Sequence, residues 1–143
     1  MSKLKFSAPL PKILRNGDEI VLKVKLMEHP ETYSIDFTEG TCPSGDIVYR
    51  IKANQNSIYQ NCRQNGSWML EDIPDDNYLA QEDENEFTVT FHFTEEEIYI
   101  YSGDESRNLE YNFQSPLSMY SIGCVHVWDD VDRVKEITFR YAD

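Results

Sequence analysis

The chain has 143 residues, a hydrophobic content of 40%, an aromatic content of 13% and a formal net charge of −13. This length and composition fit one globular domain over residues 1–143 and exclude a wholly disordered chain. The acidic charge argues against nucleic acid and against an anionic membrane surface as partners, because phosphate binding requires a basic surface.

Apolar and polar residues alternate with period two along most of the chain, which predicts a series of half-buried β-strands. The expected strands, in chain order, cover residues 18–26, 33–37, 46–52, 57–62, 87–93, 97–101, 111–113, 124–128 and 136–141. Their inward-facing side chains are expected to be Ile20, Leu22, Val24, Leu26, Tyr33, Ile35, Phe37, Ile47, Tyr49, Ile51, Phe87, Val89, Phe91, Phe93, Ile98, Ile100, Tyr111, Phe113, Val125, Val127, Ile137 and Phe139.

Turn sequences such as Asn16-Gly17 and Asn65-Gly66 separate the expected strands, and no window carries a convincing helical pattern. Many short antiparallel strands at regular spacing are typical of an all-β sandwich or jelly roll. We see no internal repeat and no linker.

The cysteines Cys42, Cys62 and Cys124 are odd in number, widely spaced and without a CxxC motif. This excludes a zinc ribbon or a thioredoxin-type site and makes a disulfide framework improbable, which favours a reducing compartment. The N-terminal stretch, residues 1–14, lacks the apolar run of a signal peptide, and no stretch approaches the length of a membrane span.

Catalytic motifs are missing from the sequence. The histidines His29, His92 and His126 lie far apart, and His92 and His126 fit outward strand positions better than metal-ligand positions. No nucleophile elbow, P-loop or dinucleotide fingerprint occurs. We therefore expect no enzymatic activity, no metal and no cofactor.

Trp68 raises a question of its own, because it directly follows the turn sequence Asn65-Gly66-Ser67, where a large apolar side chain is hard to bury. If residues 46–52, 57–62 and 68–73 are neighbouring strands, one sheet surface carries Arg50, Lys52, Asn61, Trp68 and Glu71. A pyranose packs its C–H-rich face on an aromatic ring and needs fixed donors and acceptors for its hydroxyls. Such a surface fits a sugar, but alternation equally allows Trp68 to fold back under the loop as a plug.

The order and spacing of several segments resemble those of a galectin over almost the whole chain. These segments include LRNGDEIVLKVKL, HPETYSIDF, GDIVYRI, IYQNCRQNGSWMLED, EFTVTFHF and the stretch from YNFQSPL to VKEITF. The resemblance implies a jelly-roll sandwich of two antiparallel sheets, of the galectin and concanavalin A-like kind, that binds β-galactosides on one concave face.

The family's sugar site is formed by an H-x-N-x-R strand, an asparagine on the next strand and a W-x-x-E-x-R strand. On this basis Asn61 matches the asparagine, Trp68 the stacking tryptophan and Glu71 the glutamate. The chain departs from the pattern at four positions: Arg50, Lys52, Asn54 and Ile73 stand where histidine, asparagine and two arginines would be. Each lost hydrogen bond to a bound hydroxyl costs roughly 1–3 kcal/mol, so we expect weak or absent binding of ordinary β-galactosides.

These substitutions lead to two expectations for function. The first is a lectin with altered glycan specificity, whose carbohydrate-binding residues would be Arg50, Lys52, Asn54, Asn61, Trp68 and Glu71. Arg50 and Lys52 on an otherwise acidic protein would then favour sulfated, sialylated or otherwise anionic glycans, unless they only neutralise neighbouring acids. The second is a protein–protein interaction module on a galectin scaffold that has lost sugar binding.

The resemblance also implies the partners and location of the protein. Glycans or glycoproteins are the expected partners. Galectins often dimerise through terminal strands, and residues 134–141 are a candidate for such a contact. The family is leaderless, so we expect a cytoplasmic protein with unconventional secretion.

Overall fold

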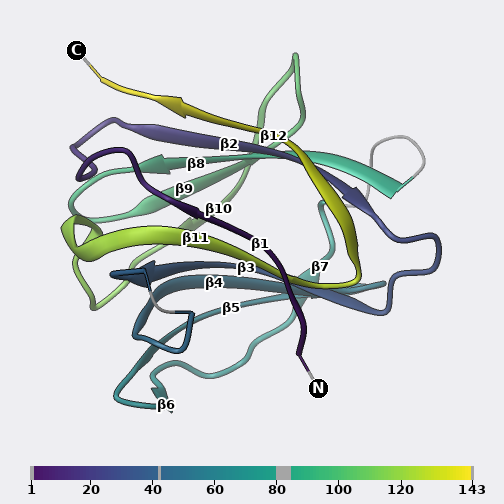
Figure 1. Ribbon diagram of the computed structural model, residues 1–143, viewed down its shortest axis with the longest axis horizontal. Coiled ribbons are helices and arrows are strands. Elements are labelled where there is room, and N and C mark those ends of the chain that lie inside the picture. The colour runs from purple at the N-terminus through teal and green to yellow at the C-terminus, as the bar shows by residue number, and fades with distance from the viewer. Residues whose placement is uncertain (1, 42, 80–84, 143) are drawn as a thin grey trace.

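The computed structural model describes residues 2–41, 43–79 and 85–142, which form two antiparallel β-sheets stacked face to face (Figure 1). The first, sheet A, has the strand order β1-β11-β3-β4-β5-β6, with β7 also paired to β5. The second, sheet B, has the order β10-β9-β8-β2-β12. The predicted all-β sandwich is therefore confirmed.

The bounds of the strands agree with most of the expected ranges. Sheet A is built from β1 (Leu4–Pro9), β3 (Thr32–Glu39), β4 (Ile47–Asn54), β5 (Ser57–Gln64), β6 (Ser67–Trp68), β7 (Asp75–Asp76) and β11 (Ile122–Asp129). Sheet B is built from β2 (Glu19–Leu26), β8 (Glu86–Phe93), β9 (Ile98–Ser102), β10 (Asn108–Phe113) and β12 (Val131–Arg140). A 3-10 turn, η2 (Met119–Ser121), precedes β11. In the described part of the chain, no helix is long and apolar enough to cross a membrane.

Aromatic rings from both sheets interlock in the core. Phe37 of sheet A lies edge-on against Phe91 and Phe93 of sheet B, with ring centroids 4.7 and 5.4 Å apart. Tyr49 of sheet A packs on Phe113 of sheet B at 4.6 Å. Such tilted and edge-to-face pairs add to the energy of burial alone, so these contacts help fix how the two sheets stack.

Most of the side chains predicted to face inward are buried in this core, with one correction in β4, whereas Tyr111, Ile137 and Phe139 are only partly buried and pack against it. Alternation places Val48 on the outer face with Arg50, yet Val48 is fully buried within the core and Ile47 lies outside the core cluster. The pairing of β4 with β5 shifts register between Ile47 and Arg50. Such a bulge adds a residue to one strand and so reverses the inside–outside alternation locally.

The expected strand over residues 68–73 is wrong beyond its first residue. The chain pairs with β5 at Ser67–Trp68, leaves the sheet, and pairs with β5 again only at Asp75–Asp76. As a result Met69, Leu70 and Ile73 are exposed, with Ile73 retaining 67% of its accessible surface.

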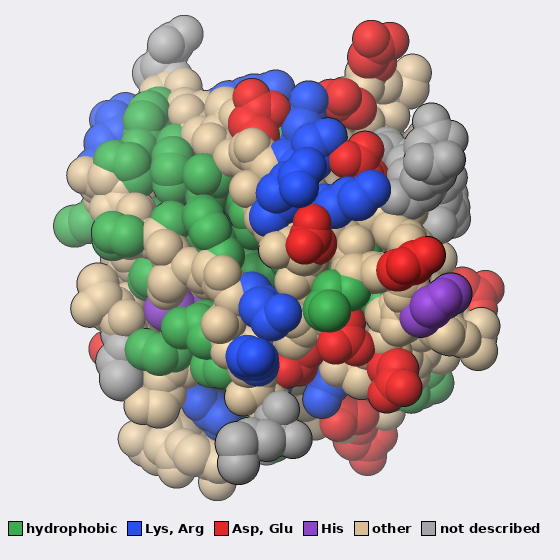
Figure 2. Space-filling view, turned by 45° about the vertical axis from the view of Figure 1, so that its right-hand side comes forward, with side chains coloured by type: hydrophobic (Ala, Val, Ile, Leu, Met, Phe, Trp, Pro, Cys, Tyr) green, Lys and Arg blue, Asp and Glu red, His purple; other side chains and the backbone are tan. Residues whose placement is uncertain are grey.

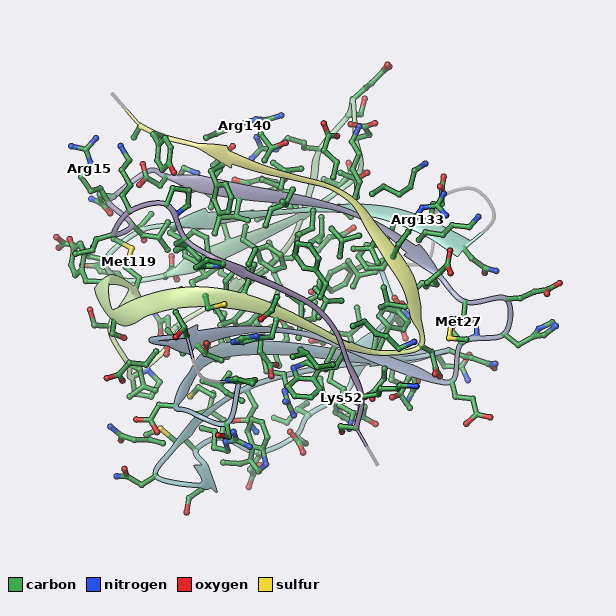
Figure 3. The ribbon with its side chains drawn as sticks, viewed as in Figure 1. Arg15, Met27, Lys52, Met119, Arg133 and Arg140 are labelled. Atoms are coloured by element: carbon green, nitrogen blue, oxygen red, sulfur yellow. The ribbon has the colours of Figure 1, made fainter. Side chains whose placement is uncertain are left out.

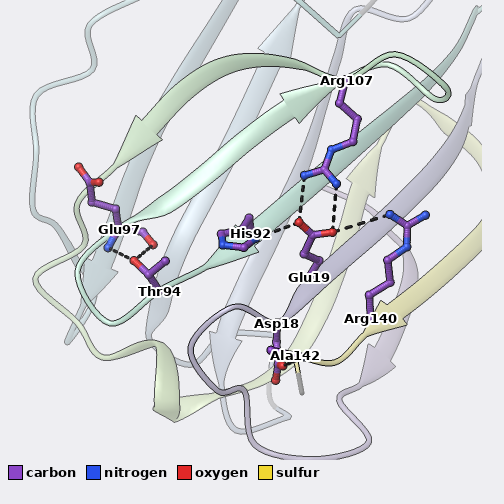
Figure 4. A network of polar contacts seen from close by, with 8 residues as sticks. All are labelled: Asp18, Glu19, His92, Thr94, Glu97, Arg107, Arg140 and Ala142. Atoms are coloured by element: carbon purple, nitrogen blue, oxygen red, sulfur yellow. Dashed lines mark hydrogen bonds and ion pairs between the residues drawn. The ribbon is translucent and has the colours of Figure 1, made fainter.

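A polar network on sheet B holds together strands that are distant in sequence (Figure 4). The Glu19 carboxylate of β2 contacts His92 Nδ1 at 2.9 Å and Arg107 Nη2 at 2.9 Å, and Arg140 Nη1 lies 3.7 Å away. Burial on its own would raise the pKa of Glu19, but the hydrogen bonds from Arg107 and His92 outweigh it and hold the pKa below its ordinary value. The network thus fixes β2, β8 and β12 to the segment between β9 and β10.

Basic and acidic side chains are intermixed on the face shown in Figure 2. Lys23 of β2 lies within ion-pair distance of Asp104 and Glu136, and Lys135 of β12 contacts Glu86 at 2.6 Å. Lys23 and Lys135 therefore neutralise neighbouring carboxylates.

Among the described residues, Cys62 and Cys124 are buried free thiols, whereas Cys42 lies outside the described residues. The expectation of unpaired cysteines thus agrees with the two thiols that can be described.

Candidate functional site

The outer face of sheet A, turned away from sheet B, carries a row of polar residues placed by strand register. His126 of β11 is opposite Asp36 of β3, Asp36 is opposite Arg50 of β4, and Arg50 is opposite Asn61 of β5. Because side chains directly opposite one another in a sheet point to the same face, all four lie on the outer face.

The adjacent row on the same face consists of Trp128, Ser34, Lys52 and Tyr59, again in register across β11, β3, β4 and β5. Figure 3 labels Lys52 on this side of sheet A. The expectation that Arg50, Lys52 and Asn61 share one sheet surface is borne out by these pairings.

A hollow of about 280 Å³ lies where β4, β5 and β6 meet. It is lined by Arg50, Lys52, Tyr59, Asn61, Trp68 and Asp72. Four of the six residues expected from sequence therefore come together in one hollow. Sequence analysis assigned no site role to Tyr59 or Asp72, although Tyr59 shares the outer face of β5 with Asn61.

Arg50 is fixed by a partner that sequence analysis missed. Its Nε and Nη2 atoms donate to the two carboxylate oxygens of Asp36 at 2.6 and 2.7 Å. The Asp36 side chain is fully buried, whereas that of Arg50 remains 20% exposed. A bidentate, charge-assisted pair of this kind restrains the guanidinium in one plane. The one visible signal was an acid in the middle of the apolar stretch YSIDF.

Trp68 lies against arginine side chains. The guanidinium carbon of Arg50 is 4.7 Å from the centroid of the Trp68 ring, and that of Arg63 is 5.3 Å from it. Arg63 is also the cross-strand partner of Trp68. The indole keeps 43% of its surface exposed, so it is not a plug buried under the loop. Its orientation is supported by cation–π contacts while part of the ring stays open to solvent.

Asn61 holds the segment that follows Trp68. Its Nδ2 donates to Leu70 O and to Asp72 Oδ1, both at 3.0 Å. Its Oδ1 accepts from Leu70 N at 3.0 Å and from Cys62 N at 2.8 Å. Both donor hydrogens and both acceptor lone pairs of the amide are therefore in use within the protein. These bonds also explain why the chain leaves the sheet at Leu70, because the Leu70 backbone bonds to a side chain instead of a strand.

Asn54 and Glu71, the remaining two expected residues, do not line the hollow. Asn54 Oδ1 accepts from Asn56 N at 3.0 Å and from Ser57 N at 2.8 Å, which closes the tight turn between β4 and β5. Glu71 lies on the exposed segment after Trp68. The structure thus gives Asn54 a turn-forming role and leaves Glu71 exposed, outside the lining of the hollow.

His126 occupies the outer face of β11 but is fully buried there. Its Nε2 lies 3.0 Å from Thr38 Oγ1, and its Nδ1 forms a short contact with Ser7 Oγ. Burial lowers the pKa of His126, and the nearby Asp36 carboxylate opposes this only in part. No group of His, Cys, Asp and Glu suited to a metal ion occurs among the residues that the structure describes.

Solved structures similar to this chain are galectins. Sheep galectin-11 in complex with glycerol superimposes with a TM-score of 0.79 at 18% identity, over 94% of this chain and 96% of that chain. A variant of human galectin-16 has a TM-score of 0.78 at 19% identity, over 96% of this chain and 95% of that chain. A galectin from Caenorhabditis elegans, LEC-6, has a TM-score of 0.76 at 14% identity, over 99% and 96%. These likenesses confirm the jelly-roll sandwich.

A search of curated proteins found no match to this chain. The family described as galactoside-binding lectin matches residues 5–139, which is nearly the whole sequence. This match shows that the chain, whose two-sheet fold carries the hollow beside Trp68, belongs to the galactoside-binding lectin family.

Proposed function

We propose that the protein is a non-catalytic glycan-binding domain whose glycan specificity differs from that of an ordinary β-galactoside lectin. The observation that carries this proposal is the hollow of about 280 Å³, in which the half-exposed ring of Trp68 stands beside Arg50, Lys52, Tyr59 and Asp72. An aromatic surface next to convergent polar groups suits the two kinds of surface that a pyranose presents.

Altered specificity is supported by how the polar groups are engaged. The Asn61 amide is fully used within the protein, so it offers nothing to a ligand in this conformation. Two of the five N–H groups of Arg50 are committed to Asp36. A ligand hydroxyl that meets a saturated partner loses a hydrogen bond, at a cost of roughly 1–3 kcal/mol, or about one to two powers of ten in affinity.

A protein-binding role is the second candidate, and the exposed apolar segment beside the hollow favours it. Met69, Leu70 and Ile73 keep 41, 43 and 67% of their surfaces exposed. Contiguous apolar side chains on a surface often mark a contact with another protein.

The test is a glycan array at near-physiological salt with the intact protein and two variants. Trp68→Ala removes the ring in the hollow. Tyr120→Ala is the matched control, because Tyr120 is also 43% exposed but lines a separate hollow with residues 12–15. We expect glycan binding that Trp68→Ala abolishes and Tyr120→Ala preserves. A blank array from folded protein would refute glycan binding and leave the protein-binding role.

A further inference from the structure

Hydrogen-bond donors outnumber acceptors among the groups that the hollow offers to a ligand. Arg50 retains its Nη1 group and one hydrogen of Nη2 after pairing with Asp36. Lys52 is exposed and carries an ammonium group with three donors and no acceptor. Because Asn61 is saturated, the remaining acceptors are the Asp72 carboxylate and the Tyr59 hydroxyl.

Lys52 differs in its pairing from six other cations of this chain. Lys23, Arg50, Arg107, Arg133, Lys135 and Arg140 each form an ion pair with a carboxylate. Lys52 forms none with any carboxylate among residues 2–41, 43–79 and 85–142. Its ammonium therefore has donors available beside the remaining donors of Arg50, on the same face of β4.

The carboxylates around the hollow do not cancel this excess. Asp36 is buried, and both of its oxygens accept from Arg50. Asp72 is exposed and already accepts one hydrogen bond from Asn61 Nδ2. Arg63, whose guanidinium lies over Trp68, adds a further cation next to the hollow. A neutral hydroxyl needs both donors and acceptors, whereas a sulfate or carboxylate accepts only and is matched by such a donor-rich site.

From this donor excess we propose that the hollow selects glycans carrying an anionic group, a sulfate ester or a carboxylate, which Lys52 and the free N–H groups of Arg50 bind together. The inference rests on the proposed glycan binding. Trp68 contacts the sugar ring that bears the group, and Asp72 accepts a hydrogen bond from a neighbouring hydroxyl. With a net charge of −13, the rest of the protein repels extended polyanions, so the selection applies to a single anionic group placed in the hollow.

The experiment measures the affinity of the intact protein for lactose, sulfated lactose and sialylated lactose at two salt concentrations. We expect the sulfated or the sialylated form to bind at least tenfold more tightly than lactose, and the comparison of the two distinguishes sulfate from carboxylate. Added salt should weaken the binding of the anionic ligands and leave the binding of lactose nearly unchanged, because salt screens interactions between charges.

Three variants test the residues. Lys52→Gln should reduce binding of the anionic ligand about tenfold and reduce binding of lactose much less. Asp72→Asn keeps an acceptor for Asn61 but removes a negative charge, so it should strengthen binding of the anionic ligand. Lys12→Gln is the control, because it changes net charge equally at an exposed lysine whose ammonium lies over Tyr141, outside the hollow.

Two results would overturn the inference. If lactose and its anionic forms bind equally well, with no effect of Lys52→Gln, anion selection is wrong while glycan binding stands. If no member of the series and no glycan on the array binds to folded protein, both the inference and the proposed function are wrong.

Discussion

The guanidinium of Arg50 links the buried Asp36 to the half-exposed ring of Trp68. It donates two hydrogen bonds of 2.6 and 2.7 Å to the Asp36 carboxylate, and its carbon lies 4.7 Å from the Trp68 ring centroid. Asp36 lies on β3 and Trp68 on β6, with β4 and β5 between them. A carboxylate that does not line the hollow therefore helps, through Arg50, to position the aromatic ring of the hollow.

Replacing Asp36 should destabilise the protein. Asp36→Asn removes the charge that compensates Arg50 inside the sheet, and breaking a buried ion pair by losing one partner costs about 3 kcal/mol. Chemical denaturation monitored by circular dichroism would measure the change in the free energy of unfolding. Asp132→Asn is the matched control, since the Arg133–Asp132 pair is exposed and should contribute little. Equal losses in the two variants would contradict a special role for Asp36.

Asn61→Ala should release the segment after Trp68. The substitution removes both the acceptor of Leu70 N and the donor to Leu70 O, so we expect a loss of about 1–3 kcal/mol in stability. Hydrogen exchange at the Leu70 amide should accelerate at least tenfold, because its partner is gone. Asn112→Ala, at an exposed position in β10, should leave this amide unchanged. Unchanged protection of Leu70 in Asn61→Ala would show that the segment is held by other contacts.

The roles of Asp36 and Asn61 could not be predicted from the sequence alone. Alternation predicted the strands of the core, because a side-chain period of two places a whole stripe of apolar residues on one face. The bulge that buries Val48 breaks that period through the pairing of β4 with β5, which no single strand encodes. The role of Asp36 depended on the register of β3 against β4 in the same way.

The prediction of a strand over residues 68–73 was wrong for a related reason. Their apolar content favours a strand, but the Asn61 side chain, nine positions away in the sequence, forms hydrogen bonds with the backbone N–H and C=O of Leu70. A side chain that replaces a strand partner competes with the sheet ladder. The residue types of the hollow could thus be proposed from sequence, whereas their free hydrogen-bonding capacity needed the structure.

Acid should weaken the network around Glu19. Its pKa is held below the ordinary value of 4.5 in the fold, so its stabilisation is complete above about pH 4.5 and is lost as the pH falls through the lowered value. Glu19→Gln should cost about 1–3 kcal/mol at pH 7, because hydrogen bonds to a charged group are lost. The difference in the free energy of unfolding between Glu19→Gln and the unchanged protein should then shrink below pH 4.5.

Glu86→Gln serves as the control for Glu19, because the Glu86–Lys135 pair is far more exposed than the Glu19 network. This variant should have little effect on stability at pH 7. Thermal unfolding between pH 3 and pH 7 would check both variants. A constant gap between Glu19→Gln and the unchanged protein over this range would contradict the linkage.

His126 should make the fold sensitive to pH in a higher range. Burial lowers its pKa from the ordinary 6.5, so the unfolded chain takes up a proton at this site before the folded protein does. The stability contributed by neutral His126 is therefore present above about pH 6.5 and is lost as the pH falls from there toward the lowered pKa. Denaturation at pH 7.5 and pH 5.5 should show a loss of stability that is smaller in His126→Gln, which cannot titrate but can still reach Thr38 and Ser7. If both proteins lose the same free energy of unfolding between these pH values, the loss comes from other groups and His126 is not the cause.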